Sequence, residues 1–337
     1  MAEIALQALN KRFGDTQAIA DFSLTVADGE FFVLLGPTGA GKTTLLRLAA
    51  GLERADSGSI AIGATDVTRT QPAHRDVTFV FQQYSLYPQY TVFDNLAFPL
   101  RSPRHRLPED QIARKVNQVA ELLGIGEKLQ NRATRLSGGE MQRVAIGRAL
   151  VRNPKVYLMD EPLSSLDAKL RADLRVELKR IQADLGATII YVTHDQMEAM
   201  TLANRIGVMN QGRLIQVAAP REIYSAPEDT YVACRLGSPR INLVPAQMLP
   251  NLDAPPGTVT IGVRPEDVVL GGEGPHGQVS LVETLGAETV VEIDCAGEEV
   301  RALLAHGQRF QSGETVGIAP RPGRAIFFDA GGRRIAA

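Results

Sequence analysis

A glycine-rich segment holds the residues best suited to chemistry. It reads Gly36-Pro37-Thr38-Gly39-Ala40-Gly41-Lys42-Thr43-Thr44 and follows the apolar residues 31–35. This spacing, between a strand and a helix, is that of a phosphate-binding loop. Inward-pointing N–H groups and the positive end of the helix would bind a polyphosphate, with Lys42 along the β- and γ-phosphates and Thr43 on a bridging Mg²⁺. The alternative is an ordinary glycine turn.

Three other apolar runs end in polar side chains. They are residues 77–81, which end in Gln82; residues 155–159, which end in Asp160 and Glu161; and residues 188–193, which end in His194. Side chains at such strand ends line ligand clefts in α/β sheets, so we expect these residues beside the phosphate-binding loop. Two acids in this place are typical of a Mg²⁺ ligand followed by a water-activating base.

A second anion site is expected where Leu136-Ser137-Gly138-Gly139-Glu140 opens a helix that stops before Pro154. A free helix N-terminus attracts anions, although a serine there is also a common structural cap. Asp167 is expected to cap the next helix, which ends at Gly186. Phe13, just before a turn, is either a core residue or a ring that stacks on a base.

Length and composition limit the class of protein. A length of 337 residues, 44% of them hydrophobic, predicts about two domains. The net charge of −2 gives no strong electrostatic attraction to nucleic acid. Cys234 and Cys295 stand alone, without a nearby Cys or His at metal-ligand spacing, which argues for a reducing compartment and against a metal site or a disulfide framework. No signal peptide or membrane span is recognisable, so we expect a cytosolic chain. The remaining histidines, His74, His105, His276 and His306, are expected to be structural or solvated.

In their order and spacing, these motifs resemble the nucleotide-binding subunit of an ABC transporter over about two thirds of the chain. The resemblance implies an α/β fold with a P-loop (RecA-like) core, an antiparallel β layer and a helical subdomain at about residues 86–153. It also implies ATP and Mg²⁺ as cofactors. Glu140 stands where the family usually has Gln, and Ser165 where close relatives often have Asn.

The resemblance also assigns roles to the site residues. Asp160 would hold Mg²⁺ through water, Gln82 would touch the metal and the attacking water, and Glu161 would be the general base. His194 would steady the γ-phosphate, and Phe13 would stack on adenine. Ser137 and Gly139, with Gly138 between them, would cap the nucleotide of a second copy. Asp167 is counted with these nucleotide-binding residues.

The last third of the chain has a different pattern. Short β-like runs at 259–263, 278–282, 288–293 and 325–328 alternate with glycine-rich turns and predict a small OB-like β-barrel. From Arg240 onward there are 8 Arg, no Lys and 12 acidic residues, unlike a nucleic-acid-binding barrel. The tail resembles the accessory barrel of importer ATPases. Residues 237–242 and 262–267 are similar to the carbohydrate-uptake (maltose/glycerol-phosphate) branch. We expect domains at 1–236 and 237–337.

The implied function is ATP hydrolysis that powers an importer. Two copies would work with two transmembrane permease subunits, docked near residues 83–99, and indirectly with a solute-binding protein. The chain would be peripheral at the cytoplasmic face of the inner or plasma membrane. A sugar or sugar derivative is the expected solute; polyamine, ferric ion and glycerol phosphate stay open. The two other classes are a soluble ABC ATPase and a barrel module that nucleotide only regulates. The chain has one ATP-binding cassette and no long coiled coil, which argues against the soluble class. It keeps Glu161, which a module that only binds nucleotide would not need.

Overall fold

The structure is a computed structural model that describes residues 1–102, 107–305 and 308–336. These residues form two compact units, Met1–Pro220 (unit 1) and Arg221–Ala337 (unit 2), which are described separately. Cys234 and Cys295 both carry free thiols. In the described ranges, we find no helix with the length and apolar character needed to cross a membrane.

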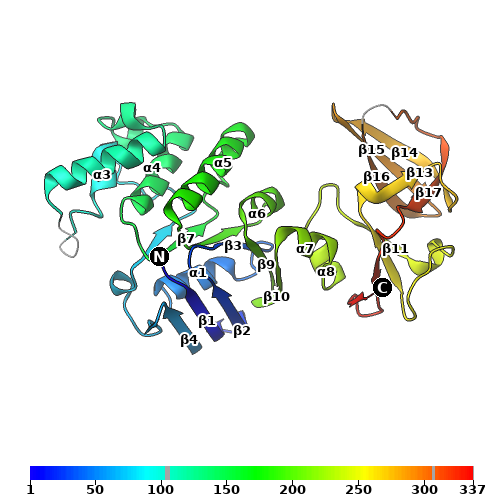
Figure 1. Cartoon of the computed structure of the whole chain (residues 1–337), viewed down its shortest axis with the longest axis horizontal. Helices are drawn as coiled ribbons and strands as arrows, with labels where there is room; N and C mark the ends of the chain where they lie inside the picture. The colour runs from blue at the N-terminus through cyan, green and yellow to red at the C-terminus, as the bar shows by residue number, and fades with distance from the viewer. Residues whose placement is uncertain (103–106, 306–307, 337) are drawn as a thin grey trace. The chain divides into compact units, whose positions relative to one another are not determined.

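Unit 1 is built on a six-stranded sheet in the order β10-β9-β3-β8-β7-β6 (Figure 1). Its strands are β3 (Phe31–Leu35), β6 (Val77–Val80), β7 (Val156–Asp160), β8 (Ile189–Thr193), β9 (Arg205–Asn210) and β10 (Arg213–Ala218). All pairs are parallel except β9 with β10. Every residue of β3, β7 and β8 is buried, as continuous apolar runs in a parallel sheet require.

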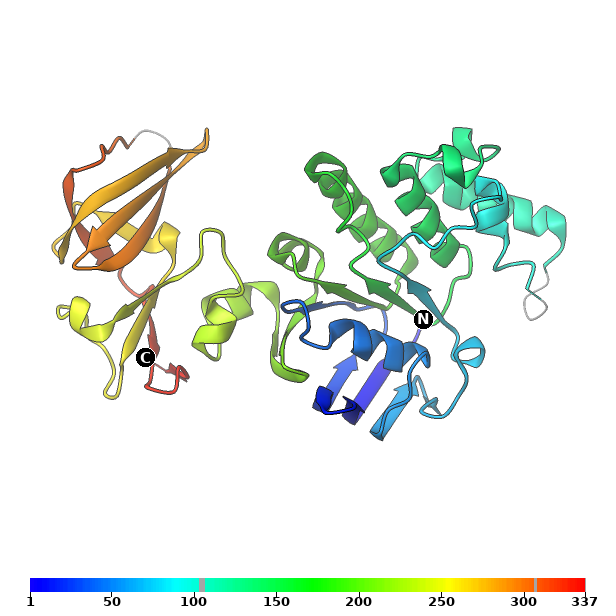
Figure 2. The ribbon, with the colours of Figure 1, turned by 180° about the vertical axis from the view of Figure 1, so that it is seen from behind.

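An antiparallel sheet in the order β2-β1-β4-β5 forms the second layer. Its strands are β1 (Ile4–Phe13), β2 (Thr16–Val26), β4 (Ser57–Ile62) and β5 (Thr65–Asp66). Helix α1 (Lys42–Ala50) lies between the two sheets in Figure 2, and its leucines share one apolar core with side chains of both. This layer agrees with the expected antiparallel one.

The other helices of unit 1 are α2 (Val92–Ala97), α3 (Glu109–Leu122), α4 (Gly138–Leu150), α5 (Ala168–Leu185) and α6 (Gln196–Leu202). Helices α2, α3 and α4 pack together where the helical insert was expected, beside the edge strand β6. Gly147 lies in the tight part of this packing, because a Cβ there would be 2.7 Å from a methyl group of Leu96 and 3.0 Å from one of Leu123, and these side chains would have to shift. The absence of a side chain lets three helices approach closely.

Unit 2 consists of short helices and two antiparallel sheets. Its elements are α7 (Pro220–Ser225), α8 (Thr230–Ala233), β11 (Asn242–Pro245), β12 (Thr260–Val263), β13 (Val268–Leu270), β14 (His276–Thr284), β15 (Glu288–Cys295), β16 (Glu298–Ala305), β17 (Thr315–Pro320), β18 (Ile326–Phe328) and β19 (Arg334–Ile335). The strand orders are β11-β12-β18-β19 and β13-β17-β14-β15-β16; both sheets contribute to a larger apolar core, and a smaller apolar cluster lies beside α8. Antiparallel strands were expected here.

Unit 2 begins at residue 221, earlier than the boundary expected at 236, and Arg264 supplies the physical reason. Its side chain is 3% exposed and donates hydrogen bonds to the carbonyls of Ala233 (3.0 Å), Leu236 and Tyr224 (2.8 Å). The guanidinium also lies 3.9 Å from the centroid of the Tyr224 ring. One buried arginine thereby ties α7 and α8 to the end of β12, so both helices belong with the second unit.

We expect Arg264→Met to destabilise unit 2 by about 2–4 kcal/mol, because three buried carbonyls lose their donor. Thermal unfolding followed by circular dichroism should show a lower transition temperature for unit 2 and an unchanged transition temperature for unit 1. The matched control is Arg324→Met, since Arg324 is exposed. An Arg264→Met chain as stable as the parent would contradict this account of the boundary.

Candidate functional site

The glycine-rich segment forms a tight loop between β3 and α1. Gly41 has φ = 100°, and a Cβ there would lie 2.3 Å from the Ala18 carbonyl; at Gly36 it would lie 2.6 Å from the Met209 carbonyl. Glycine is therefore the only residue that fits either position. Lys42, 5% exposed, donates from Nζ to the Gly36 carbonyl at 2.9 Å. Burial lowers the pKa of Lys42, and nearby carboxylates oppose that fall.

Thr43 and Asp160 meet at the start of α1. The Thr43 hydroxyl donates to Asp160 Oδ1 at 3.0 Å across the gap between α1 and the end of β7. Burial raises the pKa of Asp160, and the bond from Thr43 opposes that rise. A hydroxyl and a carboxylate oxygen side by side are the hard donors that Mg²⁺ prefers, so these residues fit the metal that the loop motif implies.

Glu161 is the residue on which the other predicted side chains converge. Its φ of 44° lies in the left-handed region, yet its N–H still donates to the Val192 carbonyl at 3.0 Å. Oε2 lies 3.0 Å from His194 Nδ1 and accepts from Gln82 Nε2 at 3.4 Å. Oε1 lies 3.8 Å from Lys42 Nζ. The ends of three strands and the phosphate-binding loop thus meet at one carboxylate.

The Ser137 segment forms a helix start. The Ser137 hydroxyl accepts from the Glu140 N–H at 3.3 Å, and the Glu140 carboxylate accepts from the Ser137 N–H at 2.8 Å, which is a capping box. Across the described residues, we find no hydrogen bond between 137–139 and the loop at 36–44. Asp167 caps α5 as expected and accepts from the Leu170 N–H at 3.0 Å.

The remaining predicted residues are placed as follows. Phe13 is the last residue of β1 and is 46% exposed, so it is not a core residue; the Lys11 ammonium lies 5.0 Å from its ring centroid. His276 is exposed on β14, while His105 and His306 lie outside the described residues.

Comparisons with known proteins agree with this geometry. Residues 19–164 match the family model "ABC transporter", and residues 261–328 match "TOBE domain". The chain is 45% identical to an sn-glycerol-3-phosphate import ATP-binding protein of Rhizobium meliloti, over 99% of this chain and 100% of that protein. It is 46% identical to a protein of the same name in Rhizobium johnstonii, over 94% of each chain.

This chain belongs to the ATP-binding subunits of ABC transporters. The expected fold class, an ABC cassette followed by an OB-like domain, is confirmed by both family matches and by solved structures. One of these is a dimeric post-hydrolysis ATP-binding cassette bound to ADP and phosphate, 28% identical with a TM-score of 0.59, covering 65% of this chain and 99% of that chain. The subunit is therefore an ATPase that powers transport.

Glu198 is a residue of this ABC ATPase that the sequence patterns did not reveal. It lies on α6, is 2% exposed, and accepts from the Tyr191 hydroxyl at 2.8 Å and the Thr193 hydroxyl at 2.7 Å. Thr193 Oγ1 in turn accepts from the Asp195 N–H at 2.9 Å, so the carboxylate supports the turn that carries His194. The sequence signal that could have revealed Glu198 is the pair of hydroxyl side chains, Tyr191 and Thr193, in the otherwise apolar strand β8.

We expect Glu198→Gln to change how the stability of this ABC ATPase depends on pH. Burial raises the pKa of Glu198, so the folded parent becomes less stable as the pH rises from the ordinary carboxyl range through the folded-state pKa. The glutamine can still accept both hydroxyls but never ionises. Urea unfolding between pH 5 and pH 8 should therefore show a gain of the variant over the parent that grows with pH. A gain that is constant or shrinks with pH would contradict the prediction.

Proposed function

We propose that this ABC ATPase hydrolyses ATP with Glu161 as general base and drives import of a sugar or sugar derivative. The observation that carries the catalytic part is the convergence of Lys42, Gln82 and His194 on Glu161, beside the paired Thr43 and Asp160. A carboxylate held in place by a lysine and by two side chains within hydrogen-bonding distance is suited to accept a proton from water.

The nucleotide would bind along residues 36–44, where backbone N–H groups and Lys42 Nζ hold the β- and γ-phosphates. Mg²⁺, bound by Thr43 and Asp160 with Gln82 nearby, would neutralise charge on the phosphates. Glu161 Oε2 would accept the proton of the attacking water, and His194 would then be free to contact the γ-phosphate. The exposed ring of Phe13 would stack on adenine.

Each site would be completed by a second copy of the chain. Ser137, Gly138 and Gly139 form a helix start that this chain does not use for its own phosphate-binding loop, and Asp167 caps the helix that follows the Glu161 loop. A related cassette has been solved as a dimer with ADP and phosphate. A homodimer that buries two nucleotides is consistent with both observations.

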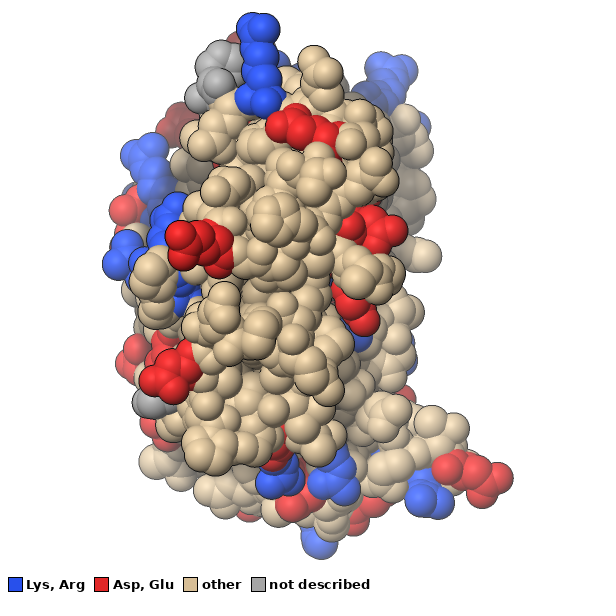
Figure 3. All heavy atoms as spheres, turned by 90° about the vertical axis from the view of Figure 1, so that its right-hand side faces the viewer, with Lys and Arg blue, Asp and Glu red and all other residues tan. Residues whose placement is uncertain are grey.

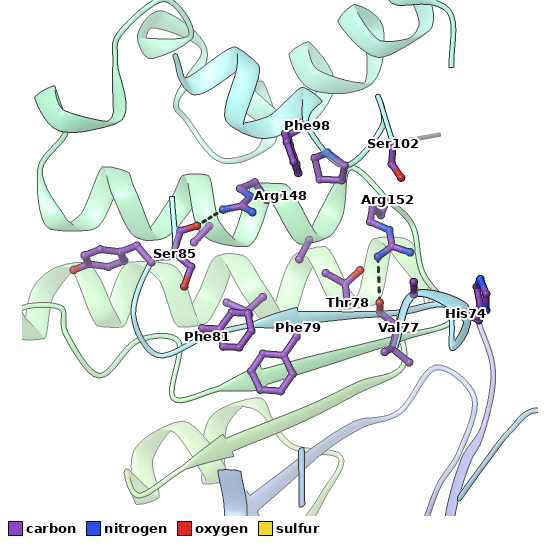
Figure 4. A pocket seen from close by; sticks show the side chains of 16 residues that line it. His74, Val77, Thr78, Phe79, Phe81, Ser85, Phe98, Ser102, Arg148 and Arg152 are labelled. Carbon is purple, nitrogen blue, oxygen red and sulfur yellow. Dashed lines mark hydrogen bonds between the residues drawn. The ribbon is translucent and has the colours of Figure 1, made fainter. Parts of the chain in front are cut away.

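A cavity beside β6 is a suitable place for permease subunits to dock. Its volume is about 530 Å³, and it overlaps the docking region expected at residues 83–99. In Figure 4, Arg148 points toward Ser85, to whose carbonyl it donates at 2.5 Å, while Phe79 and Phe81 lie on the opposite side. Because its charged lining side chains are Arg148 and Arg152, the cavity suits a neutral or acidic helix end. Docking there would hold the chain at the cytoplasmic face of the inner or plasma membrane.

The solute class is inferred from relatives named as importers of sn-glycerol-3-phosphate, which match this chain along its full length. We propose a sugar or a related polyol phosphate, delivered by a solute-binding protein. The face shown in Figure 3 has a broad centre without charged side chains and both acidic and basic side chains around it, so it lacks the continuous basic patch that nucleic acid would need.

We expect Glu161→Gln to keep ATP binding and to lower hydrolysis at least about 100-fold, since the amide preserves shape but accepts no proton. With ATP and Mg²⁺ the variant should elute as a tight dimer in size-exclusion chromatography, and adding Ser137→Arg should reverse the shift. Hydrolysis at the parent rate would refute Glu161 as general base. A monomeric elution with bound ATP would refute the shared site for the isolated subunit.

The solute is tested in membrane vesicles that hold this ATPase, its permease subunits and its solute-binding protein. We expect a sugar or sn-glycerol-3-phosphate to stimulate ATP hydrolysis several-fold, whereas spermidine and ferric ion should not. The control is Lys42→Ala, which should abolish the stimulation because it removes the phosphate-binding cation. Stimulation by spermidine or ferric ion alone would overturn the solute class and leave the ATPase assignment intact.

A further inference from the structure

One tyrosine joins segments that lie far apart in the sequence. Tyr84 belongs to the loop that begins at Gln82, and Ser165 belongs to the loop between Glu161 and Asp167. Their hydroxyl oxygens are 3.1 Å apart and share a hydrogen bond. The loop that carries Gln82 is thereby connected to the loop that follows the proposed general base.

The same hydroxyl lies against the start of α4. A Cβ placed on Gly138 would be 3.2 Å from the Tyr84 hydroxyl oxygen, so this glycine leaves just enough room for the phenol. Gly138 follows Ser137, which is proposed to contact the nucleotide of the second copy. Three loops that face the two nucleotides therefore meet at one oxygen atom.

Tyr84 also lines the cavity beside β6, together with Ser85, Phe98 and Arg148, where we place the permease subunits. A permease side chain bound in this cavity would contact Tyr84 directly. Tyr84 thus lines the proposed docking cavity and, through its hydroxyl, contacts the loop that follows Glu161.

We propose that Tyr84 is a positioning residue that couples permease docking to ATP hydrolysis through its hydrogen bond to Ser165. This inference rests on the proposed function. When the permease moves the Gln82 loop, the bond carries the loop from Glu161 to Asp167 with it, and the contact at Gly138 aligns α4. Loss of the bond leaves the nucleotide contacts of Lys42 and Thr43 in place, because neither depends on Tyr84.

The test is a double-mutant cycle in vesicles that contain the complete transporter. Tyr84→Phe and Ser165→Ala each remove one hydroxyl, and each should lower solute-stimulated hydrolysis about three- to tenfold, in keeping with one hydrogen bond. Because both lose the same bond, the double variant should be no slower than the slower single variant. The ratio of stimulated to basal hydrolysis should fall, while KM for ATP stays within about twofold.

Two further variants separate this role from a structural one. Ser165→Thr keeps a hydroxyl and should restore stimulation, whereas Tyr231→Phe makes the same chemical change in unit 2 and should behave like the parent. Thermal unfolding with ATP checks that each variant is folded. If Tyr84→Phe does not fold, the exposed Ser165→Ala and its Ser165→Thr rescue still decide the matter.

Several results would overturn the proposal. Effects that multiply in the double variant would show that the two hydroxyls act separately. An equal fall of basal and stimulated hydrolysis would show simple damage to the fold or to the nucleotide site. Parent-like stimulation in both single variants would also refute it. If the parent itself shows no stimulation by permease and solute, the proposed function fails, and this outcome is distinguishable because it involves no variant.

Discussion

The buried parallel ladder of β3, β8, β7 and β6 is the constraint on which the site depends. Its three inner strands are fully buried and mostly apolar, so the charged side chains appear where the strands end. The parallel direction then brings those ends to one edge. The phosphate-binding loop, Asp160 and His194 are near one another because each lies at, or directly after, the end of a strand of the same ladder.

At this edge of the sheet, burial shifts the pKa values of Lys42 and Asp160 in opposite directions. Burial lowers the pKa of Lys42 and raises that of Asp160, so both groups lose some preference for the charged form. Each is held by hydrogen bonds, Lys42 to loop carbonyls and Asp160 to the Thr43 hydroxyl. The lysine lies between these carbonyls and Glu161, and a polyphosphate in the loop would offer it a stronger partner than either.

The two units keep their own cores, and each depends on a buried polar anchor. In unit 1, Arg75 donates to the carbonyls of Leu48 and Ala49 and so holds the end of α1. In unit 2, Arg264 does the same for α7 and α8. Buried arginines of this kind satisfy helix carbonyls that water cannot reach. Helices without such anchors would leave polar groups exposed to an apolar core.

The residue patterns by themselves determined the phosphate-binding loop, the strand ends that carry Gln82, Asp160, Glu161 and His194, and the cap at Asp167. These are local signals, in which spacing along the chain is enough to define the chemistry and the element that holds it. The family resemblance added ATP and the importer class, and the comparisons confirmed the family. The roles of the individual site residues stay predictions.

Only the tertiary structure decided the contacts between distant segments. The exposure of Phe13, the support of the His194 turn by Glu198, and the bond between Tyr84 and Ser165 depend on side chains that long stretches of chain bring together. The start of unit 2 at residue 221 depends in the same way on Arg264, which comes 43 residues after that boundary. Such contacts leave no periodic pattern in the sequence, because their partners are set by packing rather than by spacing.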